Sequence, residues 1–370
     1  MSRQTLVYLV FFLFSVRYLF NVILGDNTLV LDLFIYAIVI LNSKVQNQKE
    51  YIFYLIFMVF DLFFNMGAMR IILVLLLCFM SYEANIKLIS KINVFAGIAV
   101  ILCILYFLQT GLFDDASHTA HNALGEERER HSFGVGYNRL SLLVFSISLN
   151  LYILLYGKIK KLLMIIIFSI IPYIVFLLTG SQTSFVGGLS LVLFHVLFHT
   201  KATRSLIERK ALLYCIPIFL LGVTIFTAYI SPYFPQLDLI FTGRPMFTLK
   251  FLNTITPMAL FIGDAESMAS SDYMALDSAH MHLVFEAGIA IYIFFYTIYV
   301  KTIKFHFILK KQYEGYNSYT LPVLLSMMVV GLGEDVLFSI ALIGFAIFWI
   351  ILFKNAKLYD NYISNYNVKH

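Results

Sequence analysis

The sequence SPYFPQLDLIFTGRPMFTLK, residues 231–250, opens the longest polar interruption in the chain, and DSAHMHLVFEAG, residues 277–288, closes it. Apolar segments long enough to cross a bilayer lie on both sides of this interruption. A second, shorter interruption covers residues 111–138. We therefore expect a membrane scaffold that holds two larger loops, 111–138 and 231–278, on one face of a bilayer.

The composition excludes an ordinary soluble protein. Of the 370 residues 61% are hydrophobic and only 13% are charged, and the mean hydropathy is +0.86. A soluble domain carries about a quarter charged residues. The net charge of +5 does not indicate a nucleic-acid partner, because the basic residues lie in short loops between apolar segments. The three cysteines all lie in apolar segments, so we expect no disulfide.

The apolar segments predict an all-α polytopic helical bundle. A membrane helix needs about 17–25 apolar residues, and about twelve segments approach this length. They are residues 5–24, 28–42, 51–66, 67–83, 92–110, 138–157, 162–179, 184–200, 211–230, 279–300, 319–333 and 336–353. Barrel strands would alternate in polarity, which these runs do not. We expect residues 1–370 to form a single integral membrane domain.

The distribution of basic residues predicts the orientation. Alternate loops are rich in lysine and arginine, as at Lys158–Lys161 and Lys201–Lys210. The loops 111–138 and 231–278 belong to the other set. Because basic loops stay in the cytoplasm, both termini are expected there and both larger loops outside.

Arginines in an outer loop work against membrane insertion and so need another reason. For Arg128 the simplest reason is an ion pair with a neighbouring glutamate. For Arg130 and Arg244 we favour a functional role. Arg244 precedes Pro245, a residue that suits the first position of a helix. A helix N-terminus and an arginine fork both favour anions, so a diphosphate site is expected at Arg244.

The first outer loop offers two further patterns. Gly134 permits a tight turn just before the next span, which would put Arg130 and His131 at the membrane surface, where lipid head groups lie. The Asp114, Asp115, His118 and His121 cluster has metal-ligand side chains, and the two histidines can share a helical face. Such ligands in a flexible loop are a weak signal, and we expect no metal or other cofactor.

Two other stretches allow both a structural and a functional interpretation. Residues 179–184 read TGSQTS, either an ordinary turn with Ser184 capping the next helix or a polar floor for a sugar or phosphate. His280, at the start of a span, is either a packed interfacial residue or a general base for a hydroxyl.

Together these motifs resemble the Wzy-type polysaccharide polymerases and the related O-antigen ligases. The matching pieces occur in the same order in both. They are Arg130–Asn138 (with Tyr137 in place of a usual proline), Thr179–Ser184 (with Gln182 where arginine is common), Thr242–Arg244, and Asp277–Ser278 followed by Gly288. The resemblance covers essentially the whole chain.

The resemblance implies a GT-C-like, metal-independent glycosyltransferase of the bacterial cytoplasmic membrane. Its substrate would be an oligosaccharide on undecaprenyl diphosphate, and its partners would include the bilayer, a flippase and a chain-length regulator. Arg130 and Arg244 would hold the diphosphate. His280 would act as base, with Asp277 orienting or replacing it, and which of the two does so is open. The remaining residues expected to contact substrate are His131, Asn138, Ser181, Thr183, Ser278 and His282.

Two alternatives to a polymerase are a ligase, which transfers finished polymer to another acceptor, and a transporter of the same lipid-linked sugar. A transporter needs a polar pathway through its spans. Arg17, Asp32, Asp61 and Arg70 are the span charges available for one. They are few, and the arginines and histidines of the outer loops favour the enzyme.

Overall fold

The computed structural model describes most of the 370 residues. They are residues 3–24, 78, 81, 84–113, 115, 117–121, 127–135, 137–200, 203–204, 207–240, 244–263, 278–313, 318–334, 337 and 343–369. The predicted spans 28–42 and 51–66, with nearly all of 67–83, lie outside them, as do Asp32, Asp61 and Arg70.

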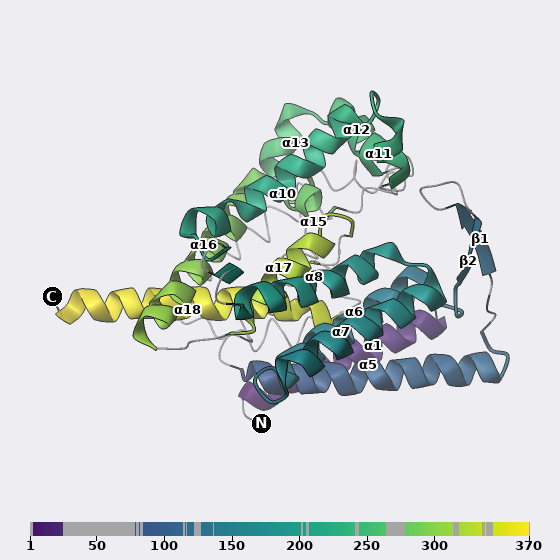
Figure 1. Ribbon diagram of the computed structural model, residues 1–370, viewed down its shortest axis with the longest axis horizontal. Helices are drawn as coiled ribbons and strands as arrows, with labels where there is room; N and C mark the ends of the chain where they lie inside the picture. Colours follow the sequence, from purple (N-terminus) through teal and green to yellow (C-terminus); the bar gives the residue numbers. More distant parts are fainter. Residues whose placement is uncertain are drawn as a thin grey trace.

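The described residues form a bundle of long helices (Figure 1). Six helices are long and apolar enough to cross a membrane, which confirms a helical membrane protein. They are α5 (Ile86–Gln109), α6 (Tyr137–Leu155), α7 (Lys161–Thr179), α8 (Gln182–His199), α10 (Lys210–Ile230) and α16 (Ile289–Gln312). The other helices of the bundle are α1 (Arg3–Leu24), α17 (Thr320–Val330) and α18 (Ala346–Lys369).

The outer faces of the bundle are apolar, as lipid contact requires. On α7 the side chains of Leu162, Ile166, Ile170, Ile174 and Leu177 are all exposed. They recur every three or four residues and therefore lie along one side of the helix. A surface of this kind would be costly in water, so this side of α7 is expected to face hydrocarbon.

The core lies where α16, α17 and α18 meet. Phe295 of α16 contacts the ring of Trp349 of α18, and both side chains are buried. The indole N–H of Trp349 donates to the carbonyl oxygen of Leu337, which satisfies its one polar group. α17 packs closely on α8, where Gly187 lies against Val330.

Two predicted spans are corrected by the structure. Residues 279–300 are interrupted: α15 (Ala279–Met281) and the π-helix η3 (His282–Glu286) end before Gly288, and α16 begins after it. Gly288 has φ 85°, which residues with a Cβ rarely adopt. In the segment 336–353, a short 3-10 turn, η5 (Ile343–Phe345), precedes α18, which continues to Lys369.

The two larger loops contain secondary structure. In 111–138 the strands β1 (Ser117–His121) and β2 (Glu127–His131) form an antiparallel hairpin, with Ser117 opposite His131. His118 and His121 therefore lie on a strand, and the helical face expected for them is wrong. The loop 231–278 contains α11 (Pro235–Ile240), α12 (Arg244–Thr254) and α13 (Pro257–Ile262), at the top of Figure 1.

Candidate functional site

A buried carboxylate joins two of the motifs singled out in the sequence. Glu334, just beyond the end of α17, is only 4% exposed. The side-chain amide of Asn138, at the start of α6, donates to it, with Nδ2 lying 3.1 Å from both carboxylate oxygens. Arg244, the first residue of α12, places Nη2 3.2 Å from Oε1. The helix start expected at Arg244 is confirmed, with Pro245 as its second residue.

The network continues into the turn between α7 and α8. The hydroxyl of Ser181 donates to Oδ1 of Asn138 at 3.3 Å, and the hydroxyl of Ser184 donates to that of Ser181 at 3.3 Å. Ser181, not Ser184, occupies the N-cap position of α8, and its side chain makes no capping bond. The capping role expected for Ser184 is therefore wrong. The hydroxyls of this turn instead extend the polar network around Asn138.

A cavity of about 500 Å³ lies beside this network, bounded by α7, α8, α10, α12 and the end of α17. One part of its wall is polar and contains Arg244, Gln182, Thr183 and Ser278. Another part is apolar and is formed by Phe176, Phe185, Val186 and Val223. A cationic group thus shares a cavity with aliphatic and aromatic side chains. This combination suits an amphiphile with an anionic head and an apolar tail.

The polar wall is closely packed around Gly333, which also lines the cavity. A Cβ built on Gly333 would lie 3.5 Å from Nη1 of Arg244 and 3.8 Å from Cγ2 of Thr183. The guanidinium and the Thr183 side chain therefore both lie against the same glycine. The turn after α7 and the start of α12, expected on the same face of the membrane, do meet.

Of the residues that follow Asp277, one lines the cavity and others are buried in the core. Ser278 lines the cavity, but His280 and His282 do not. His280 is fully buried, with Nε2 3.2 Å from the carbonyl oxygen of Met328, and its Nδ1 has no hydrogen-bond partner among the described residues. His282 pairs through Nδ1 with the carboxylate of Glu286. Asp277 lies outside the described residues, so the choice between it and His280 as base stays open.

The hairpin holds His131 through an acidic partner. Nδ1 of His131 lies 2.9 Å from Oδ2 of Asp115, whose other oxygen accepts the backbone N–H of Phe133 at 3.0 Å. The turn expected at Gly134 is confirmed by its φ of 70°. The backbone of Arg130 lies on β2, and its side chain is outside what the structure describes. Its expected contact with a diphosphate therefore stays a prediction.

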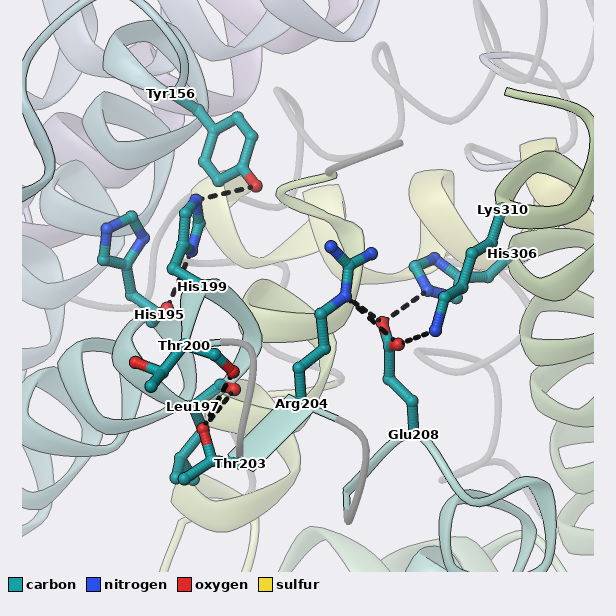
Figure 2. Close-up of polar contacts among 10 residues, drawn as sticks. All are labelled: Tyr156, His195, Leu197, His199, Thr200, Thr203, Arg204, Glu208, His306 and Lys310. Atoms are coloured by element: carbon teal, nitrogen blue, oxygen red, sulfur yellow. Dashed lines mark hydrogen bonds and ion pairs between the residues drawn. The ribbon is translucent and has the colours of Figure 1, made fainter. Parts of the chain in front are cut away.

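A second polar cluster lies at the opposite ends of α8, α10 and α16 (Figure 2). The buried carboxylate of Glu208 accepts from Nε of Arg204 at 3.1 Å, from Nζ of Lys310, and from Nε2 of His306 at 3.5 Å. Burial alone would raise the pKa of Glu208. The hydrogen bonds from His306 and Lys310 and the charge of Arg204 outweigh it and lower the pKa to about 2. Glu208 thus anchors the α8–α10 connection to α16.

Glu208→Gln is expected to lower the melting temperature at pH 7 by about 5 °C, because it breaks a buried ionic cluster. The pKa of Glu208 is lower in the folded state than the usual value of about 4.3 in an unfolded chain. Its stabilising contribution is therefore full above that pH and is lost as the pH falls towards 2. Thermal unfolding in detergent should show the difference between wild type and variant shrinking from pH 6 to pH 3.

The control for this prediction is Asp360→Asn, which removes an exposed ion pair with Lys301. Exposed pairs contribute little, so a shift below about 1 °C is expected. A difference between wild type and Glu208→Gln that stays constant with pH would show that Glu208 does not titrate in this way.

Glu334 is the residue of this site that sequence reasoning missed. The one signal available was an acidic residue at the edge of an apolar segment, where charges are costly and usually paired. The partner, Arg244, precedes it by 90 residues, and hydropathy does not show such a pairing.

No protein-family model, curated protein or solved structure matches the chain. The function is therefore inferred from the geometry of the site and from the sequence motifs.

Proposed function

We propose that the protein is a polysaccharide polymerase. It joins oligosaccharide repeat units carried on undecaprenyl diphosphate, at the outer face of a bacterial cytoplasmic membrane. The observation that carries this proposal is Arg244 in a cavity that also has an apolar wall, within a bundle of membrane helices. The order of the motifs along the chain, which resembles that of the Wzy-type polymerases, supports it.

The two parts of the cavity wall match the two parts of such a substrate. A diphosphate would bind at Arg244, since a guanidinium donates two parallel hydrogen bonds to phosphate oxygens. The first isoprenoid units would pack between α8 and α10, against Phe185, Val186 and Val223. Thr183 and Ser278, on the polar part of the wall, would donate hydrogen bonds to sugar hydroxyls or phosphate oxygens.

The proposed reaction is a displacement at a sugar carbon. A hydroxyl of the incoming unit attacks the anomeric carbon of the growing glycan, and the bond from that carbon to the diphosphate oxygen breaks. The diphosphate leaves with the electron pair, and Arg244 and Arg130 neutralise its charge. The proton of the attacking hydroxyl passes to a base, and Asp277 is the stronger candidate of the two, because His280 is fully buried and does not line the cavity. Because the two arginines would neutralise a good leaving group, the proposed reaction needs no metal.

In the same proposal the helices form a GT-C-like bundle with both termini in the cytoplasm. The site would then lie on the outer side, where a flippase delivers the repeat units and a chain-length regulator limits the product. The apolar cavity wall favours this enzyme over a transporter, because a transport pathway for a large glycan has to be polar along its length.

The test uses purified protein in nanodiscs with a lipid-linked repeat unit, and products are separated on a gel. We expect a ladder of multiples of the unit that persists in EDTA. Transfer of a preformed polymer to another acceptor, without a ladder, would indicate a ligase. Movement of the unit across a vesicle bilayer without any new glycosidic bond would indicate a transporter. Loss of the ladder in EDTA would contradict the metal-free mechanism.

A further inference from the structure

We infer that Glu334 is a positioning residue that aligns Arg244 for the diphosphate, an inference that rests on the proposed function. Glu334 accepts hydrogen bonds from Arg244 and Asn138 and is not among the residues that line the cavity. It would therefore act on the substrate through Arg244, which lines the cavity, rather than by touching it.

Because Glu334 is buried, its carboxylate depends on hydrogen-bond and ion-pair partners. A carboxylate taken out of water is costly unless charged or polar groups compensate it. Here the compensation includes Asn138 at the start of α6 and Arg244 at the start of α12. Because a guanidinium is planar, an oxygen 3.2 Å from Nη2 restricts the direction in which the whole group points. Glu334 thus orients the arginine that lines the cavity.

Glu334 also sets the orientation of the Asn138 side-chain amide. With its Nδ2 donating to Glu334, Asn138 turns its Oδ1 towards Ser181, which donates to it at 3.3 Å. A carboxylate, which accepts hydrogen bonds and donates none, therefore fixes which way the Asn138 amide faces. The polar turn after α7 is in turn held against the start of α6. A neutral amide at position 334 can donate as well as accept and would not impose this orientation.

The ion pair also has an electrostatic consequence. The negative charge of Glu334 balances part of the positive charge of Arg244 before substrate binds, and this weakens the attraction for a diphosphate. In exchange the arginine is already aligned for the charge that develops on the leaving group. Removal of the Glu334 charge should therefore leave substrate affinity unchanged or improved while turnover falls. A residue that only stabilised the fold would not lower turnover while leaving substrate affinity unchanged.

The experiment compares Glu334→Gln, Glu334→Asp, Arg244→Ala and the double variant Arg244→Ala/Glu334→Gln in the nanodisc assay. For Glu334→Gln we expect kcat to fall about 10-fold to 100-fold with KM unchanged or lower, since small misplacements of a catalytic group cost about this much. Glu334→Asp, which keeps the charge, should retain more activity. The double variant should be no less active than Arg244→Ala, because Glu334 acts through Arg244.

The matched control is Glu208→Gln. It also neutralises a buried carboxylate that accepts from an arginine, but at the far end of the bundle. We expect it to lower the stability of the protein. The kcat of the folded variant should stay within about twofold of wild type, because Glu208 lies far from the cavity. An equal loss of kcat in Glu208→Gln, an unchanged kcat in Glu334→Gln, or a double variant clearly worse than Arg244→Ala would each overturn the inference.

Failure of the proposed function has a different outcome. If wild type makes no ladder, binding of undecaprenyl diphosphate is measured by thermal shift with the same variants. Affinity that is kept or improved in Glu334→Gln, and equally weak in Arg244→Ala and the double variant, would support the alignment of Arg244 by Glu334 without a polymerase. Affinity lost in Glu334→Gln, or an additional loss in the double variant, would overturn it.

Discussion

Arg244→Ala is expected to abolish polymer formation, lowering turnover by at least about 100-fold, because it removes the guanidinium that would stabilise the leaving diphosphate. Arg244 is the cation that lines the polar wall of the described cavity, and no lysine or second arginine lines it with Arg244. The change also leaves Glu334 buried with less compensation. The measurement is the initial rate of ladder formation, at protein levels matched by size-exclusion chromatography.

Lys250→Ala provides the control on the same helix. Lys250 is exposed on α12, six residues after Arg244, and does not line the cavity. Its ammonium group lies over the ring of Phe247. We expect turnover within about twofold of wild type, as for most surface substitutions. Long polymer made at a normal rate by folded Arg244→Ala would remove Arg244 from the mechanism, and the same result with Arg130→Ala would remove Arg130.

Gly188→Leu is expected to have the largest effect on stability. Gly188 of α8 faces Pro172 of α7, and a Cβ at this position would lie 2.2 Å from Cγ and 2.5 Å from Cβ of the proline. A proline ring has no rotamer that moves it aside, so α7 and α8 would have to separate. Overpacking of this kind costs about 1–3 kcal/mol or more. We expect a melting temperature lower by at least about 5 °C, or loss of monodisperse protein, by fluorescence-detected chromatography.

Gly222→Leu is the matched control for this prediction. Gly222 also lies inside a membrane helix, α10, but a Cβ there would meet no atom of the described residues within 4 Å. Leucine has a favourable free energy of insertion in a lipid-facing helix. Wild-type stability is therefore expected. A similar loss in both variants would mean that glycine flexibility, and not the close approach of α7 and α8, decides the effect.

The helices themselves were the part of the fold that the sequence predicted best. The span predicted at 162–179 is α7, Lys161–Thr179, and the span at 211–230 is α10, Lys210–Ile230. In hydrocarbon the backbone has to satisfy its hydrogen bonds internally, and a long apolar segment does so by forming a helix. The interruption at Gly288 was not predicted, because the residues that follow it are apolar and hydropathy does not show its φ of 85°.

The site was predicted in part for a similar reason. The loops were expected on one face, and Asn138, Ser181 and Arg244 do lie close together, although α7, α8, α10 and α11 separate Asn138 from Arg244 along the chain. The direction of His280 was not predictable: a residue two positions from Ser278 on a helix turns to another side, here towards Met328. Hydropathy likewise gave no sign that Glu334 would be buried against an arginine.

The contacts of Glu334 have a consequence for biosynthesis. Asn138 precedes Glu334 by 196 residues and Arg244 precedes it by 90. A nascent chain inserts its helices from the N-terminus, and contacts between distant segments form only when the later segment has emerged. The start of α6 and the start of α12 therefore have no Glu334 to hold them until α17 has been made. A ribosome that stops earlier would release a membrane protein in which the proposed substrate site is incomplete.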